Sequence, residues 1–209
     1  MKKLDLKFKF TKIDQGCLLA SLEIAFNFLD KKVNIGKMRQ ELSQNKFGYD
    51  ILEVASYLIE KKFEIEVGCF DSDIFKEKKV FTLEELKDIY QNEELSKYPK
   101  EDLAELIKFA KKYPDKLNVG YKDLDFLKQL ADKDLPTITN LEIKTYTGDK
   151  TDNSIHSVVI GGYDKDDIFI MDPILEKIRL SSKTFKKAWF NAGQYYLVVK
   201  NKTVISTIA

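Results

Sequence analysis

Two short β-rich runs, 157–160 and 168–171, flank a turn rich in glycine and aspartate, and together they predict a β-hairpin. His156 directly precedes the first run and Asp172 directly follows the second. Asp164 is the midpoint between them and lies in the middle of the turn, so a regular antiparallel pair places His156 opposite Asp172. Directly opposed residues hold their Cβ atoms roughly 4.5–5.5 Å apart. A bulge in the glycine-rich turn would shift this register by one residue.

A carboxylate paired with an imidazole can prepare the imidazole to act as a base. A fixed carboxylate holds the neutral imidazole in one tautomer and stabilises the imidazolium that forms when the ring accepts a proton. His156 is the only histidine in the chain, so any base catalysis by imidazole depends on it. The plainer interpretation is a structural histidine on a strand, followed later by a turn-forming Asp172-Pro173 pair.

Cys17 opens a stretch with helical spacing, in which apolar residues recur every three or four positions from Leu18 to Leu29. Asp14 is the expected N-cap of this helix. A helix start carries unpaired N–H groups and a partial positive charge, which favour a thiolate and can stabilise an oxyanion. Cys17 is therefore the candidate nucleophile, whereas Cys69, at the end of a predicted strand, is expected to be a buried structural residue.

The rest of the chain alternates between helical and strand patterns. A charged stretch over about 71–118 carries two amphipathic patterns and is interpreted as a helical insertion. The length of 209 residues and a hydrophobic content of 44% fit one large domain or one domain with an insertion. The expected helices are 35–42, 50–61, 83–90, 103–113, 124–130 and 183–190, and the expected strands are 63–67, 136–143 and 195–199.

Composition excludes several classes of partner. The 35 basic and 34 acidic side chains nearly cancel to +1, so no overall field attracts the chain to nucleic acid or to an anionic membrane. No apolar run approaches the roughly 18 residues of a membrane-spanning helix, and the charged start does not resemble a signal peptide. We therefore expect no nucleic-acid or membrane partner. With only two cysteines, we expect reduced thiols and a cytoplasmic location.

The sequence also lacks the motifs of common metal and cofactor sites. A structural zinc site needs about four Cys or His ligands, which two cysteines and one histidine do not supply. The pair Gly161-Gly162 fits a hairpin better than a phosphate-binding loop. The acidic turn at 164–167 lacks the glycine and terminal glutamate spacing of an EF-hand. We therefore expect neither a metal nor a cofactor.

Several motifs follow the order of a known peptidase group. They are DQGCLLAS at 14–21, GYD at 48–50, HSVVIGGY at 156–163, IFIMDP at 168–173, TFKKAW at 184–189 and YLVV at 196–199. In these motifs the chain resembles the peptidase C39-like family of papain-like cysteine peptidases, along most of its length apart from the insertion. The resemblance implies a single peptidase domain over 1–209 with a papain-like α+β fold. In that fold, the N-terminal helix bearing the cysteine packs on an antiparallel β-sheet bearing the histidine and aspartate.

The resemblance also implies residue roles, with Cys17 as nucleophile, His156 as base and Asp172 as the orienting acid. The family usually has glycine directly after the nucleophile, where this chain has leucine, and an oxyanion-hole glutamine several residues upstream. Thr11 occupies that upstream position and offers only a hydroxyl, while Gln15 lies closer to the cysteine. Either Gln15 reaches the site through a shifted loop or the oxyanion hole is reduced to backbone N–H groups. Losing one such donor typically lowers the rate about 10²- to 10³-fold.

Three interpretations of function remain open on the sequence. The first is a cysteine hydrolase that cleaves an amide of a peptide or protein substrate through a thioester. The second is an acyltransferase that uses the same thioester. The third is an inactive or weakly active binding module that holds a protein partner through the 71–118 insertion. Tyr49, Asp50 and Asn140 are further candidates for residues that line the cleft.

Overall fold

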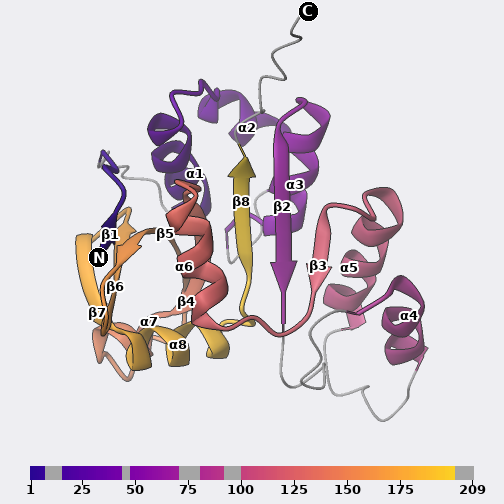
Figure 1. Cartoon of the computed structure of the whole chain (residues 1–209). Coiled ribbons are helices and arrows are strands. Elements are labelled where there is room, and N and C mark those ends of the chain that lie inside the picture. Colours follow the sequence, from indigo (N-terminus) through magenta and orange to yellow (C-terminus); the bar gives the residue numbers. More distant parts are fainter. Residues whose placement is uncertain (8–15, 44–47, 71–80, 92–99, 201–209) are drawn as a thin grey trace, which may run out of the picture.

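The computed structural model describes residues 1–7, 16–43, 48–70, 81–91 and 100–200. Eight strands form one sheet in the order β3-β2-β8-β4-β5-β6-β7, with β1 paired to β5 (Figure 1). The strands are β1 (Lys2–Lys3), β2 (Glu64–Cys69), β3 (Leu117–Val119), β4 (Thr137–Glu142), β5 (Ile155–Tyr163), β6 (Asp167–Asp172), β7 (Glu176–Ser181) and β8 (Tyr196–Lys200). The helices are α1 (Cys17–Phe28), α2 (Ile35–Glu41), α3 (Ile51–Glu60), α4 (Leu83–Gln91), α5 (Lys100–Lys112), α6 (Leu124–Asp132), α7 (Ile143–Thr147) and α8 (Ser182–Asn191).

Helices cover both faces of the sheet. Side chains alternate along a strand, and on β8 Leu197 and Val199 belong to one core cluster while Tyr196 and Val198 belong to the other. The first cluster packs the sheet against α1 to α5, and the second packs it against α6 and α8. The α+β class is therefore confirmed, with the sheet buried as the middle layer.

The hairpin of β5 and β6 is confirmed, but its expected register is wrong. Val159 pairs with Met171, and a bulge between Ile160 and Gly162 shifts the register by one residue toward the turn. If this pairing is extended along the strands, the position directly opposite His156 lies two residues after Asp172. An offset of two keeps both side chains on the same face, where diagonal neighbours remain within reach of long side chains.

Gly162, beside this bulge, is required by the approach of the N-terminal strand. Its φ is 136°, and a Cβ atom on it would meet the carbonyl oxygen of Lys2 at 2.2 Å. Lys2 and Lys3 of β1 pair here with Tyr163 and Gly162. The glycine therefore lets a third strand approach β5 next to its bulge.

The charged stretch over about 71–118 is more closely built into the fold than a helical insertion implies. Its two expected helices are confirmed as α4 and α5. The following residues form β3, which pairs in parallel with β2, so the sheet is not wholly antiparallel. Leu86 and Phe109 are buried in the same cluster as the residues of α1. In Figure 1, α4 and α5 lie beyond β3, at the opposite end of the sheet from β7.

Most other expected elements are confirmed near their predicted bounds, while β1, β3, β7 and α7 were not expected. The exposed residues of β7 give it a weak apolar pattern, and α7 is a single short turn. None of the helices in the described ranges has the length and apolar character needed to cross a membrane.

Candidate active site

Cys17 is the first residue of α1, at the end of the helix where backbone N–H groups lack partners within the helix. Gly16 occupies the N-cap position, and no side chain in the described part of the chain caps the helix. The first intrahelical bond runs from the N–H of Ala20 to the carbonyl of Gly16 at 2.9 Å. Asp14, the expected cap, lies outside the described residues. The first-turn N–H groups are therefore left without a side-chain cap beside the thiol.

A buried hydrogen bond fixes α1 to the strand that carries the histidine. Ser21, one turn after Cys17, donates its hydroxyl to the carbonyl of Ser157 at 2.8 Å. Both serines are buried, and Ser157 directly follows His156. Apolar packing of Leu19 and Leu22 against the first core cluster holds the rest of the helix. The bond therefore sets the position of the thiol along the strand relative to the imidazole.

His156 and Asp172 form a buried pair. Nε2 of His156 lies 3.1 Å from Oδ1 of Asp172, and their residues are 5% and 0% exposed. Oδ1 of Asp172 also accepts the N–H groups of Ile174 at 2.8 Å and Leu175 at 3.0 Å. These two bonds form an Asx-type turn, which is the structural role expected of an Asp-Pro sequence. The same carboxylate also holds the imidazole.

Tyr146 contacts the second oxygen of this carboxylate. Its hydroxyl donates to Oδ2 of Asp172 at 3.0 Å, so both carboxylate oxygens are held. Burial and the neighbouring carboxylate raise the pKa of Tyr146, which keeps its hydroxyl protonated as a donor. Tyr146 lies on α7, and Glu142 at the start of that helix accepts a bond from Asn191 of α8 at 2.8 Å. The short helix is therefore fastened to α8.

The three candidate groups shift one another's pKa. Burial by itself lowers the pKa of His156, but hydrogen bonds to Asp172 and Cys17 and the charges of both raise it to about 9. Burial raises the pKa of the Cys17 thiol, yet the hydrogen bond and charge of His156, with a hydrogen bond from the backbone N–H of Ser157, lower it overall. The pKa of Asp172 is likewise lowered, against burial, by His156 and two backbone N–H groups. The site therefore favours a thiolate, an imidazolium and a carboxylate.

The two ring nitrogens of His156 have different neighbours. Nε2 faces Asp172, which leaves Nδ1 as the nitrogen that can bond to the thiol of Cys17. The imidazole therefore lies between the thiol and the carboxylate. A chain of this kind transfers a proton between sulfur and a leaving group while the carboxylate holds the ring.

Asn140 lies beside this group of residues. It pairs with Ser157 across β4 and β5, and its Oδ1 accepts the hydroxyl of Ser157 at 2.8 Å. Ser157 in turn contacts Cys17, as the lowered pKa of the thiol reflects. Asn140 is therefore linked to the thiol of Cys17 through Ser157.

The remaining candidates have other positions. Asp50 caps α3 by accepting the N–H groups of Leu52 at 2.7 Å and Glu53 at 2.9 Å. Tyr49 is half-buried and packs against the first core cluster. Gln15 and Thr11 lie outside the described residues. The structure therefore brings together Cys17, His156, Asp172 and Asn140, and it gives Asp50 a local bond to its own helix.

Tyr146 and Ser157 were not among the site residues predicted from the sequence. Tyr146 lies in a short helix with no periodic pattern, between a strand and a polar loop, so no signal in the sequence distinguishes it from other tyrosines. Ser157 directly follows the only histidine, and strand alternation places it on the other face of the sheet. That placement could have been used, because the other face is the one that α1 covers.

Metal chemistry has no ready ligand set in the described part of the chain, where no three His, Cys, Asp or Glu side chains are grouped to hold an ion.

Comparison with known proteins places this chain among peptidases. A putative C39-like peptidase from Bacillus anthracis shares 12% sequence identity and a TM-score of 0.58, with 97% of this chain and 98% of that chain covered. A double glycine motif protease from an AMS/PCAT transporter, solved in complex with the leader peptide, shares 13% identity and a TM-score of 0.50, with 95% of each chain covered. No curated protein matches the sequence. The model of the Peptidase_C39 like family matches residues 2–197, and the chain therefore belongs to that family.

Proposed function

We propose that this protein is a cysteine peptidase that cleaves an amide bond of a peptide or protein through a thioester on Cys17. Membership of a peptidase family makes the protein a hydrolase, and the proposal concerns how it works. The observation that carries it is the position of His156, whose Nε2 lies 3.1 Å from Asp172 and whose ring also forms a hydrogen bond with Cys17. A histidine with a purely structural role would not need to contact both a thiol and a carboxylate.

The proposed reaction begins with a thiolate and an imidazolium. The sulfur attacks the carbonyl carbon of the substrate, and the resulting oxyanion collapses as the carbon–nitrogen bond breaks. His156 gives its proton to the leaving amine and becomes neutral. The neutral imidazole then takes a proton from water, whose oxygen attacks the thioester, releases the acid and restores the thiolate and imidazolium. Asp172 holds the imidazole throughout.

The oxyanion is assigned to the first turn of α1. Backbone N–H groups at a helix start point along the helix axis and carry a partial positive charge. No side chain in the described residues caps these groups, which supports their use by a substrate oxygen. The side-chain contributions of Gln15 and Thr11 remain proposals, as do cleft roles for Tyr49, Asp50 and Asn140.

The test is cleavage of a mixture of peptides from a digested proteome, followed by mass spectrometry. Cys17→Ala and His156→Ala should remove all new cleavage products. Cys69→Ala is the matched control, because Cys69 is the other cysteine and is buried in β2 at 2% exposure. Cleavage that survives Cys17→Ala would contradict the proposal.

A second proposed role, binding of a partner, is favoured by a cavity of about 610 Å³ between α4 and α5. Its lining includes Ile107 and four lysines, of which Lys108 pairs with Glu105 and Lys112 with Glu60. Lysines beside an apolar side chain suit an acidic peptide segment with a hydrophobic side chain. Lys108→Glu with Lys111→Glu should abolish binding of a fluorescent Glu-rich peptide containing one leucine. Lys187→Glu on α8 is the control, and equal binding by all three proteins would exclude this role.

Location in a reducing compartment such as the cytoplasm belongs to the same proposal. Cys17 is not joined in a disulfide, and a nucleophilic cysteine must stay reduced to react.

A further inference from the structure

Exposed apolar residues lie close in sequence to the proposed catalytic pair. In the described part of the chain, five large hydrophobic residues are strongly exposed: Met1, Tyr90, Ile155, Ile174 and Leu175. Three of the five lie within three residues of His156 or Asp172 in sequence, with exposed fractions of 51% for Ile155, 57% for Ile174 and 53% for Leu175. The histidine and aspartate themselves are buried.

These three residues are tied to the pair by short connections. Ile155 is the residue before His156 on β5. The N–H groups of Ile174 and Leu175 lie 2.8 and 3.0 Å from Oδ1 of Asp172, the same oxygen that faces the imidazole. Their backbones are therefore held in place, and their side chains face solvent at a fixed distance from the imidazole.

Exposure of three such side chains needs a reason. A Leu or Ile side chain left in water forgoes the favourable free energy of burial, although single exposed apolar residues are common on protein surfaces. A group of them beside a reactive site is typical of a surface that an apolar ligand covers.

The chemistry of the proposed reaction decides which part of the substrate passes here. The acyl carbon bonds to the sulfur of Cys17, and the leaving nitrogen must reach the imidazole that protonates it. The substrate chain that follows the broken bond therefore runs past His156. Ile174 and Leu175 lie beside Asp172, on the side of the imidazole away from the thiol.

We propose that Ile155, Ile174 and Leu175 form an apolar subsite for the leaving side of the substrate, so that the protein prefers a large apolar residue in the first two positions after the cleaved bond. This inference rests on the proposed function and adds the substrate class. The occupant is a hydrophobic side chain of a peptide.

The experiment sequences the bonds cleaved in peptides from a digested proteome, by the wild type and by an Ile174→Ser and Leu175→Ser double variant. The wild type should enrich Ile, Leu, Val or Phe at least threefold after the cleaved bond, and the double variant should lose this enrichment. Cleavage of a peptide with leucine at that position should fall about tenfold in the variant. The rate of Cys17 alkylation should stay unchanged, because the substitutions keep the backbone N–H groups that bond to Asp172.

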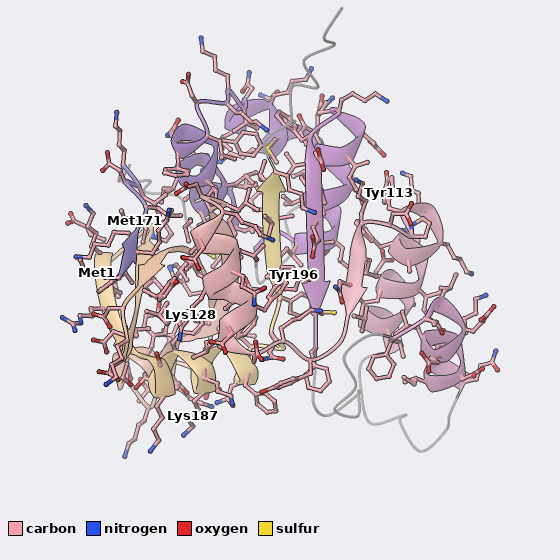
Figure 2. The ribbon with its side chains drawn as sticks, viewed as in Figure 1. Met1, Tyr113, Lys128, Met171, Lys187 and Tyr196 are labelled. Atoms are coloured by element: carbon pink, nitrogen blue, oxygen red, sulfur yellow. The ribbon has the colours of Figure 1, made fainter. Side chains whose placement is uncertain are left out.

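Lys187→Ser is the control variant. Lys187 is an exposed residue of α8 that points away from the body of the molecule in Figure 2, and its replacement should leave both the enrichment and the rate unchanged. Cleavage without apolar enrichment in the wild type, or the same enrichment in the double variant, would overturn the subsite while leaving the peptidase intact. A double variant that changes only the oligomeric state would assign the patch to self-association instead. The absence of any cleavage that depends on Cys17 would refute the proposed function, and the subsite with it.

Discussion

At the scale of single residues, the site is a row of ionisable side chains that shift one another's pKa. Cys17, His156 and Asp172 each have a shifted pKa, and each shift depends on a neighbour in the same line. Burial opposes every charged form, so the charged state exists because the partners outweigh desolvation. Tyr146 is the next residue in this row, and its hydroxyl donates a hydrogen bond to Oδ2 of Asp172.

Replacing Tyr146 with phenylalanine tests whether it positions the carboxylate. The change removes the donor to Oδ2 of Asp172 and leaves the ring in place. We expect kcat for a cleaved peptide to fall about tenfold with KM unchanged, because a less constrained carboxylate holds the imidazole less well. Tyr163→Phe is the control, since its hydroxyl bonds to the exposed Asp132 at 2.7 Å. Equal kcat values in the two variants would rule out the positioning role.

The pH profile of turnover follows from the two opposite shifts. The pKa of His156 is raised to about 9, so the imidazolium that protonates the leaving amine persists up to that pH and is lost above it. The pKa of Cys17 is lowered, so the thiolate persists below the ordinary value of a cysteine and is lost as pH falls. We expect kcat/KM for peptide cleavage to form a bell with its alkaline limb near pH 9. An alkaline limb near pH 6.5 would mean that His156 is unperturbed.

At the scale of elements, the sequence predicted which segments meet but not their register. The His–Asp hairpin was expected from turn chemistry, and its two strands do pair. The predicted midpoint at Asp164 was wrong, because the turn closes between Tyr163 and Ile168 and the bulge adds a residue. Tyr146 could not be predicted, since its place depends on how α7 packs on α8 rather than on any local pattern.

The bond from Ser21 to the carbonyl of Ser157 is the element-scale contact that aligns α1 with β5. Ser21→Ala leaves that buried carbonyl without this donor, and we expect a loss of about 1–3 kcal/mol in the free energy of unfolding. Urea denaturation measures this loss. Ser43→Ala, at an exposed position after α2, should change stability by less than about 0.5 kcal/mol. A Ser21 variant as stable as the Ser43 variant would show that the bond contributes little.

At the scale of the whole molecule, the charged stretch is part of a shared core rather than an appendage. Leu103, Leu106 and Phe109 of α5 are buried in the cluster that also contains α1 and α3. Lys112 of α5 also bonds to Glu60 of α3 at 2.8 Å, an exposed pair that adds little. Figure 2 shows Tyr113, just after α5, on the opposite side of the view from Met171, the neighbour of Asp172. The lysine-lined cavity and the proposed active site are therefore separate surfaces.

One substitution tests this shared core. Phe109 is 4% exposed, so Phe109→Ala should lower the free energy of unfolding by about 3–5 kcal/mol. Trp189, the only tryptophan, is buried in the second cluster, and its fluorescence reports on the other face of the sheet. We expect the Trp189 transition to shift with the same midpoint as far-UV circular dichroism, as one cooperative unit requires. A Trp189 transition that stays at the wild-type midpoint would show that α5 unfolds independently.

The central claim, that His156 activates Cys17, is tested most directly by the alkylation rate of Cys17 against pH. The measurement uses intact mass in a Cys69→Ala background, with and without His156→Ala. We expect the alkylation rate to hold a plateau down to about pH 5 when His156 is present and to lose this plateau in the His156→Ala variant. A rate that rises with a midpoint near 8.5 in both proteins would contradict the account, because Cys17 would then behave as an ordinary thiol.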